Sequence, residues 1–397
     1  MFSTVIQLYI VAQFFKVLGF VLHTVPMGIW FAGLPLAILC LLQNGKNPNR
    51  FARRIFTQLP IMLAIGINFG IVPLLFTQTI FYKPFYTATI LMAWSWFAVV
   101  PILIVGYYAV YLAAFSVKTT DPLKQNAKKN NNKENKRNKN STRKNYRTII
   151  FGVIASLCLI AIGTLMVNGQ TLMVRNDLWS SIMERTGVYG ATTGLANNMS
   201  DPSVWIRLST VFAIGMITTA VWSIVDSHFL LRKSADANEE IEDADYRGWT
   251  LSFAFIVTII GAAMLAGISC LTACFNIAGF VSTKIAELPV AEMSVLITSA
   301  VSLSVVGVLM LAMKLCAGLR GKILVAVVAI AHVVVLSGFG IIRQLGQNAR
   351  LQQYVESAQS LSLAWEAFIP FLIIFVIGAV VIGWMLRQLI VAKTETF

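Results

Sequence analysis

The sequence predicts an all-α membrane protein, a polytopic bundle of about nine transmembrane helices. Hydrophobic residues make up 57% of its 397 residues and charged residues only 12%, with a mean hydropathy of +0.75. A soluble domain carries about 25% charged residues. Apolar stretches long enough to cross a hydrocarbon core about 30 Å thick recur along the whole chain. Together these observations exclude a soluble globular fold.

Nine such stretches follow one another along the chain. A further apolar stretch, residues 2–15, lacks the basic region and the small-residue cleavage site of a signal peptide. We expect it to form either a helix at the outer interface or an extension of the first span. The predicted spans are residues 17–42, 55–80, 88–115, 147–172, 206–231, 249–271, 293–317, 322–345 and 365–390.

One membrane domain is expected, interrupted by a linker. Residues 1–117 hold the first three spans and residues 149–397 the other six. Residues 118–148 between them are rich in Asn and Lys and almost without apolar side chains, which predicts a disordered cytoplasmic linker. It either rests against anionic lipid headgroups or is an insertion without a function. The acidic run at 236–245 is expected on the same face, where it attracts the linker weakly.

Basic residues gather in alternate connections. The first connection, the 118–148 linker, the fifth connection, the turn near Arg320 and the C-terminal tail hold most of the Lys and Arg residues. Because cytoplasmic loops carry the excess of positive charge, nine spans place the N-terminus outside and the C-terminus in the cytoplasm. The net charge of +14 is therefore a topology signal, and no nucleic-acid partner is expected.

Few polar side chains lie inside the predicted spans. His23 lies near the outer end of the first span and His332 near the middle of the eighth, while Asp226 and His228 lie at the inner end of the fifth. Two neutral imidazoles from different spans are able to ligate a haem iron. Each can instead donate to a backbone carbonyl of a neighbouring helix. We expect Asp226 to pair with Arg232 or His228 as a local anchor.

Acidic residues are almost absent from the spans. Only Asp226 and the boundary residue Glu366 lie within them, and none lies in the first three. Buried carboxylates ordinarily carry protons through proton-coupled transporters and oxidases. Five cysteines lie in or at the ends of spans without a C-x-x-C pair, and they are expected to act as small apolar residues. Gly66 and Gly70 form a small-xxx-small pair that allows close approach of another helix.

Three stretches resemble subunit I of the cytochrome bd-type quinol oxidases. "GFVLHTVPMGIWFAGLPLAI" resembles that family's first span, in which a histidine near the outer surface ligates a haem. "IFTQLPIMLAIGINFGIVP" resembles its second span, and "DPSVWIRLSTVFAIGMITTAVW" resembles the start of its fifth. The resemblance implies a nine-span fold with an outside N-terminus, and it makes His23 a haem ligand.

The chain also departs from that family. Leu208 stands where the fifth span of the family supplies a histidine to the low-spin haem, and the third span lacks the family's glutamates. The quinol-binding loop between spans six and seven is reduced to about 20 residues. Met293 is placed near the position of the family's methionine ligand. A low-spin haem must then be absent or ligated otherwise, for example through His332.

The resemblance implies a divergent subunit I of a bacterial inner membrane, active in quinol-linked electron transfer, with haem as cofactor, quinol as substrate and a second polytopic subunit as partner. Its predicted cofactor-binding residues are His23, which would hold the haem iron, His332 and Met293. Oxygen reduction by this chain alone is not expected, because the third-span acids are missing. Two alternatives stay open: a haem-free scaffold subunit of a membrane complex, and a transporter or channel for a small solute.

Overall fold

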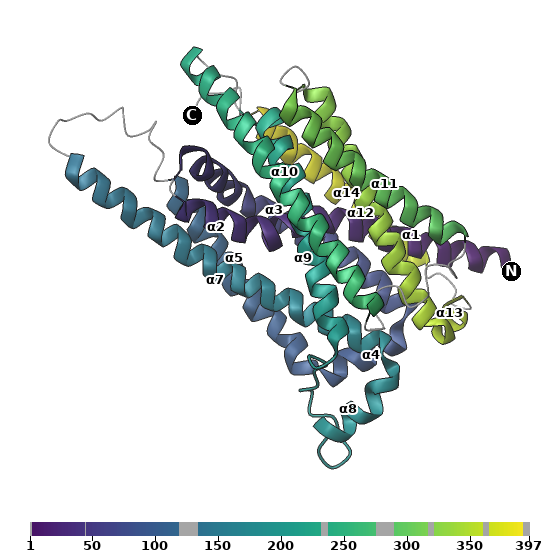
Figure 1. Cartoon of the computed structure of the whole chain (residues 1–397). Coiled ribbons are helices and arrows are strands. Elements are labelled where there is room, and N and C mark those ends of the chain that lie inside the picture. The colour runs from purple at the N-terminus through teal and green to yellow at the C-terminus, as the bar shows by residue number, and fades with distance from the viewer. Residues whose placement is uncertain are drawn as a thin grey trace.

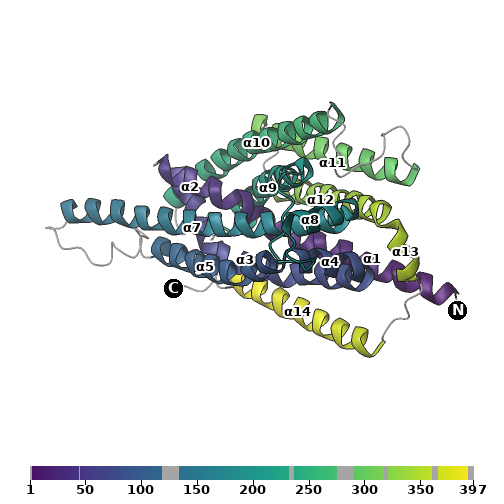
Figure 2. The same cartoon turned by 90° about the horizontal axis from the view of Figure 1, so that it is seen from below.

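The computed structural model describes residues 2–43, 45–118, 134–231, 237–274, 290–316, 321–359 and 365–391. This part of the chain is almost wholly helical, and its long helices lie side by side in one elongated bundle (Figure 1). The all-α membrane bundle predicted from the sequence is confirmed. The two ends of the bundle carry the connections, as the view at right angles also shows (Figure 2).

Every predicted span corresponds to a long helix. Shorter helices and turns join these at the ends of the bundle. In chain order the elements are α1 (Phe2–Gly28), η1 (Ile29–Gly33), α2 (Leu34–Leu42), α3 (Lys46–Ile80), α4 (Tyr82–Leu91), α5 (Ala93–Lys118), α7 (Glu134–Val174), η3 (Asn176–Leu178), α8 (Trp179–Thr186), α9 (Pro202–Phe229), α10 (Ala237–Cys274), α11 (Val290–Leu315), α12 (Lys322–Arg350), α13 (Gln352–Gln359) and α14 (Trp365–Val391).

Within the described residues, seven helices are long and apolar enough to cross a membrane. They comprise the continuous α1–η1–α2 run from Tyr9 to Leu42 together with α3, α5, α7, α9, α10 and α12. Two shorter apolar segments, Ser299–Leu315 of α11 and Ile369–Val381 of α14, accompany them. The chain is thus a multi-pass membrane protein, and the placement of its N-terminus outside remains a prediction.

Three boundaries differ from those predicted. α1 already begins at Phe2, so residues 2–15 extend the first span. The start of the third predicted span is a separate helix, α4, because the helix is interrupted at Met92 before α5 begins. α7 begins at Glu134, so part of the predicted 118–148 linker is helical. Residues 119–133 of that linker, and most of the connection between spans six and seven, lie outside the described residues.

The first span changes its helical geometry after Pro26. Because proline has no N–H, it cannot continue the backbone hydrogen-bond ladder, and a short π-helical segment, η1, follows. The hydroxyl of Thr219 on α9 donates to the carbonyl of Gly28, 3.2 Å away. A Cβ atom on Gly28 would lie 2.8 Å from Cβ of Thr218. Glycine at this position therefore allows α1 and α9 to cross in direct backbone contact.

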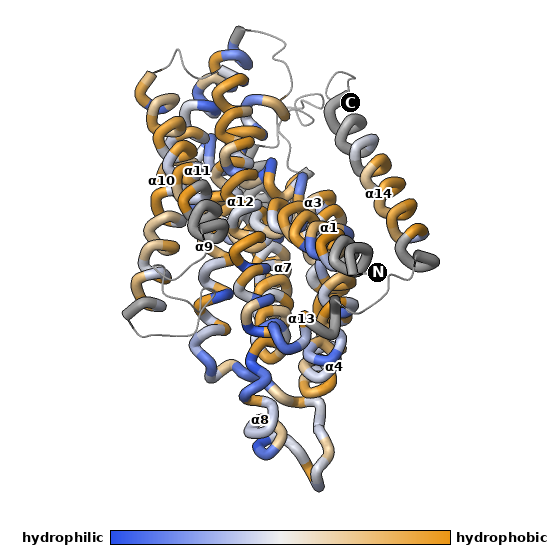
Figure 3. The backbone as a smooth tube through the Cα atoms, turned by 90° about the vertical axis from the view of Figure 1, so that its right-hand side faces the viewer, coloured by the Kyte–Doolittle hydropathy of each residue, from blue (hydrophilic) through white to orange (hydrophobic). Residues whose placement is uncertain are grey.

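Apolar side chains fill the interior and also cover the outside of the bundle. One buried cluster joins η1, α2 and α3 to α5 and α7, and a second joins α9 and α10 to α11 and α12. Figure 3 shows hydrophobic backbone along the helices and hydrophilic segments towards the ends. In water an outer surface of this kind would be unfavourable, whereas in a bilayer it contacts lipid.

α14 lies at the edge of the bundle, apart from most other helices (Figures 2 and 3). It contacts the bundle through aromatic rings. Phe371 packs edge-on against Phe76 of α3 at 5.3 Å between ring centroids, and Phe375 packs against Phe15 of α1 at 5.9 Å. Edge-to-face pairs of this kind favour a defined helix position without polar contacts.

Candidate functional site

His23 of α1 faces α3. Its Nδ1 lies 2.7 Å from the carbonyl oxygen of Gly66, so the ring donates this N–H to the backbone of the second span. In the neutral imidazole the other nitrogen, Nε2, then carries the lone pair. The residue is half-buried, so its neighbours do not enclose it completely.

The two predicted packing glycines fix this ring in place. A Cβ on Gly70 would lie 2.8 Å from both Cε1 and Nδ1 of His23. A Cβ on Gly66 would overlap the indole ring of Trp30, which itself packs edge-on against the imidazole at 5.7 Å between centroids. The small-xxx-small prediction is confirmed: Gly66 and Gly70 let α3 approach α1 closely enough to form the His23 hydrogen bond.

His332 of α12 lies in a different environment. It is only 4% exposed, and its Nε2 lies 3.0 Å from the hydroxyl of Thr218 on α9. Because that hydroxyl already donates its hydrogen to the carbonyl of Ile214, it must accept from Nε2–H of the histidine. His332 Nδ1 is then the unprotonated nitrogen, and it is buried without a hydrogen-bond partner among the described residues.

Two further positions were singled out in the sequence. Met293 lies in the first turn of α11, where only the backbone is described, so its role as a ligand stays a prediction. Leu208 of α9 is half-buried and packs against the apolar cluster around η1 and α3. Leucine offers no atom that ligates iron. No group of three or more His, Cys, Asp or Glu side chains able to hold a metal ion is found in the described part of the chain.

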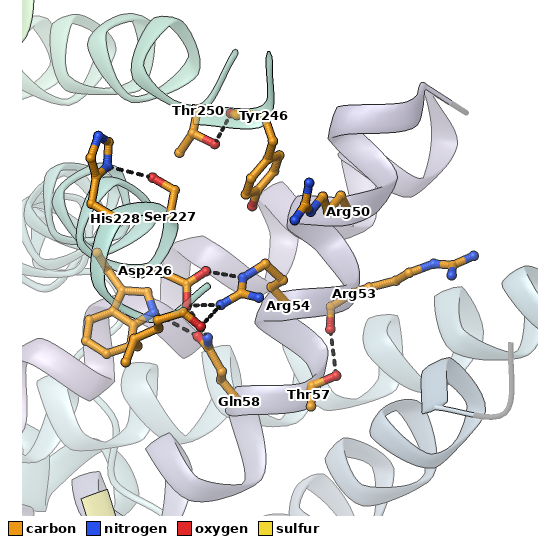
Figure 4. A network of polar contacts seen from close by, with 12 residues as sticks. Arg50, Arg53, Arg54, Thr57, Gln58, Asp226, Ser227, His228, Tyr246 and Thr250 are labelled. Atoms are coloured by element: carbon orange, nitrogen blue, oxygen red, sulfur yellow. Dashed lines mark hydrogen bonds and ion pairs between the residues drawn. The ribbon is translucent and has the colours of Figure 1, made fainter. Parts of the chain in front are cut away.

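A second polar site lies at the opposite end of α3. Arg54 of α3 binds both carboxylate oxygens of Asp226 on α9 (Figure 4). Gln58 donates to the same carboxylate at 2.5 Å and accepts from the indole N–H of Trp222 at 2.9 Å. The side chain of Asp226 is 5% exposed and that of Arg54 is 23% exposed. The carboxylate is thus neutralised and hydrogen-bonded where it enters the bundle.

Asp226 pairs with a residue that the sequence did not suggest. Of its two expected partners, Arg232 lies outside the described residues, so that pairing stays a prediction. Nδ1 of His228, the other expected partner, interacts with the carbonyl of Ile224 and the hydroxyl of Ser227 instead. The partner is Arg54, which the sequence analysis assigned only to the basic first connection. Asp226 is nevertheless an anchor, since it joins α3 to α9.

The acidic run at 236–245 also contacts the first connection. Lys46 pairs with Glu242 at 2.8 Å, Arg50 pairs with Asp243, and Asn47 donates to Asp245 at 2.8 Å. These contacts join the start of α3 to the start of α10. The predicted partner was the 118–148 linker, of which residues 119–133 lie outside the described residues, so that attraction stays a prediction.

Tyr246 lies between these ion pairs. Its side chain is fully buried, and Arg50 lies over its ring at 4.6 Å from the centroid (Figure 4). The phenol oxygen has no hydrogen-bond partner among the described residues. These contacts join α3, α9 and α10 in a group of polar residues that we call the polar clasp: Arg50, Arg54, Gln58, Asp226, Asp243 and Tyr246.

Two cations inside the bundle were not singled out from the sequence. Lys16 of α1 is 1% exposed, donates to the amide oxygen of Gln347 at 2.5 Å and lies over the ring of Phe81. Arg343 of α12 lies over the ring of Phe20 and donates to Gln170 at 3.3 Å. Each is a single charge in a long apolar stretch. A lone cation in each of two apolar stretches is the signal that the sequence offered.

Neither a family model nor a curated protein sequence matches this chain. Among solved structures, a chain of the bd oxidase from Geobacillus thermodenitrificans has a similar fold, with a TM-score of 0.61 and 12% sequence identity. The similarity covers 97% of this chain and 98% of that one. The chain thus has a fold similar to that of a bd oxidase chain, as the resemblance of the first, second and fifth spans implied.

Proposed function

We propose that this chain is a divergent bd oxidase-like membrane subunit that acts in quinol-linked electron transfer, with one haem held by His23, in a bacterial inner membrane. The observation that supports the haem most directly is the hydrogen bond from His23 Nδ1 to the carbonyl of Gly66. A metal-ligating histidine ordinarily donates its other ring N–H to such an acceptor, which fixes the tautomer and the orientation of the ring.

The surroundings of His23 fit such a ligand better than those of His332. The Nε2 lone pair of His23 belongs to a ring that is partly accessible inside the bundle. His332 has its Nε2 engaged by Thr218, and its free nitrogen is enclosed by close packing. When bound, haem supplies one-electron chemistry. The protein contributes the axial nitrogen of His23, the orienting carbonyl of Gly66 and the aromatic wall formed by Trp30.

This chain offers few side chains that could deliver protons. No acidic residue lies in the first 120 positions, and Asp226 is held by Arg54 and Gln58. A carboxylate whose oxygens are already engaged by Arg54 and Gln58 is poorly placed to pass on a proton. Electron transfer together with a second polytopic subunit, rather than oxygen reduction by this chain alone, is therefore the role that we propose.

A haem-free scaffold subunit is the second candidate. The same His23–Gly66 hydrogen bond would satisfy the imidazole without iron, and the polar clasp at the other end is a structural device. Haem content separates the two candidates. Protein expressed with an adequate haem supply and purified in mild detergent should contain about one haem per chain by the pyridine haemochrome assay. Folded protein without haem would support the scaffold role instead.

A further inference from the structure

Two cations from different helices belong to one hydrogen-bonded group. Lys16 of α1 is buried, and Arg343 of α12 is half-buried. Lys16 donates to Gln347, whose amide donates to Gln170, and Gln170 also accepts from Arg343. This chain of hydrogen bonds holds the two charges near each other, about one to two turns before α12 ends at Arg350.

Neutral groups surround this pair. Lys16 contacts the amide oxygen of Gln347 and the face of Phe81, whereas Arg343 contacts the amide oxygen of Gln170 and the face of Phe20. In the described part of the chain, neither cation forms an ion pair. A charge inside the bundle that is not paired is unfavourable, and two neighbouring charges of the same sign are more so.

The surrounding amides use only part of the hydrogen-bonding capacity of the two cations. The oxygen of Gln170 accepts from both Arg343 and Gln347, the latter at 3.4 Å. The oxygen of Gln347 accepts from Lys16. Since an ammonium group has three N–H donors and a guanidinium five, each cation retains donors beyond those used here. The cluster therefore presents positive charge and N–H groups.

The charged side chains just outside this pair differ from it, because they have partners of opposite charge. Arg175 pairs with Asp177 at 2.9 Å and with Asp201 at 2.8 Å. Both carboxylates also act electrostatically on Arg350. The outer layer is thus compensated by the protein itself, while the inner pair is compensated only by amides and rings.

We propose that Lys16 and Arg343, with Gln170 and Gln347, form a binding site for a phosphate group inside this end of the bundle. Phosphate offers a charge of about −2 and acceptor oxygens in several directions, which matches two cations and the remaining amide donors. Arg343 is half-buried, so the group is not sealed from its surroundings. Its place near the end of α12 is compatible with a phospholipid headgroup and also with free phosphate.

The proposal is tested by thermal unfolding of delipidated protein in a non-ionic detergent. One arm adds inorganic phosphate against chloride at equal ionic strength. A second arm adds phosphatidylglycerol against diacylglycerol, which has the same tails without phosphate. A rise in melting temperature in the first arm identifies free phosphate as a ligand, and a rise in the second arm alone identifies the lipid headgroup.

The variant Lys16→Met separates binding from a structural role. Methionine keeps the length and apolar stem of lysine but removes the charge, so it also relieves repulsion from Arg343. We expect the ligand-free variant to melt at or above the wild-type temperature and to lose at least half of the phosphate-induced shift. Lys16→Arg should restore that shift. Lys83→Met, at an exposed lysine of α4, is the matched control and should respond as the wild type does.

Two results would overturn the proposal. In the first, neither phosphate source raises the melting temperature of the wild type more than its matched control does. In the second, Lys16→Met keeps the full shift. If Lys16→Met fails to fold, Arg343→Gln is measured in its place. Native mass spectrometry of the wild type is then the second test of the site. Absence of retained phospholipid or phosphate would contradict the site.

Discussion

Arg54 and Asp226 are 172 residues apart in the sequence, yet the guanidinium of one binds both carboxylate oxygens of the other. This pair joins the start of α3 to the end of α9, and Gln58 and Trp222 extend it by two further hydrogen bonds. Asp226 is the only acidic side chain in the first eight predicted spans, and its carboxylate is engaged in holding two helices together.

Removing one partner of this pair should destabilise the protein strongly. In Arg54→Met the carboxylate of Asp226 stays buried without its counter-charge, which costs about 3–5 kcal/mol. The melting temperature in detergent should fall by several degrees. In the double variant Arg54→Met/Asp226→Leu, most of that loss should be recovered, because no uncompensated charge remains. Lys46→Gln, at a pair that is 62% and 56% exposed, is the control and should change little.

A double variant as unstable as the single one would contradict this account. The pair would then contribute through its shape and hydrogen bonds rather than through charge compensation.

Gly70 should tolerate no larger side chain. In Gly70→Ala the new methyl group would lie 2.8 Å from the His23 ring, so the ring or α3 must move. Overpacking of this kind costs about 1–3 kcal/mol. Gly267→Ala in α10 has no atom within 4 Å of the new methyl group and should stabilise slightly, since alanine favours helix. Melting temperatures of the two variants in one detergent give the comparison, and equal effects would argue against close packing at His23.

The sequence predicted the helices well and their contacts poorly, for a physical reason. The position of a long apolar helix is set by its local composition, so the long helices and the packing role of Gly66 and Gly70 could be predicted. The partner of Asp226 depends on which helices meet, and Arg54 lies on a different helix, α3. Lys16 and Arg343 were overlooked because one charge hardly alters the hydropathy of a long stretch. Their juxtaposition exists only once α1 and α12 are packed.

His332 should act as a structural hydrogen-bond donor. In Thr218→Val the volume is kept, but Nε2–H of the buried imidazole loses its acceptor. An unsatisfied buried donor costs about 1–3 kcal/mol, whereas Thr218→Ser retains the hydroxyl and should cost less. Thermal unfolding distinguishes the two, with Thr57→Val at an exposed threonine as control. Equal stability of the Val and Ser variants would show that the hydrogen bond contributes nothing.

The free energy of unfolding should depend on pH through Asp201, which lies directly before α9. Burial opposes ionisation of this carboxyl, but hydrogen bonds from Ser203 and Asn198 and the charge of Arg175 outweigh it and hold the pKa of Asp201 below its ordinary value. A carboxyl whose folded pKa is depressed stabilises the fold above its unfolded pKa, near 4. That contribution is lost as the pH falls through the folded value.

Asp201→Asn keeps a side chain that can begin a helix but removes the charge. Above about pH 5 the variant should be less stable than the wild type by about 1 kcal/mol, and the difference should shrink towards pH 3. Melting temperatures measured across this range test it, with Glu184→Gln on α8 as a control at an exposed carboxylate. A difference that is constant with pH would exclude a contribution from the charge.

The central claim, a haem held by His23, is tested most directly by a reduced-minus-oxidised visible spectrum of the purified protein, of His23→Ala and of His332→Ala, each expressed with haem supplied. The account predicts Soret and α bands in the wild type and in His332→Ala, and their loss in His23→Ala. Bands that persist in His23→Ala and disappear in His332→Ala would move the haem to α12. Folded wild-type protein without any haem bands would contradict the electron-transfer function altogether.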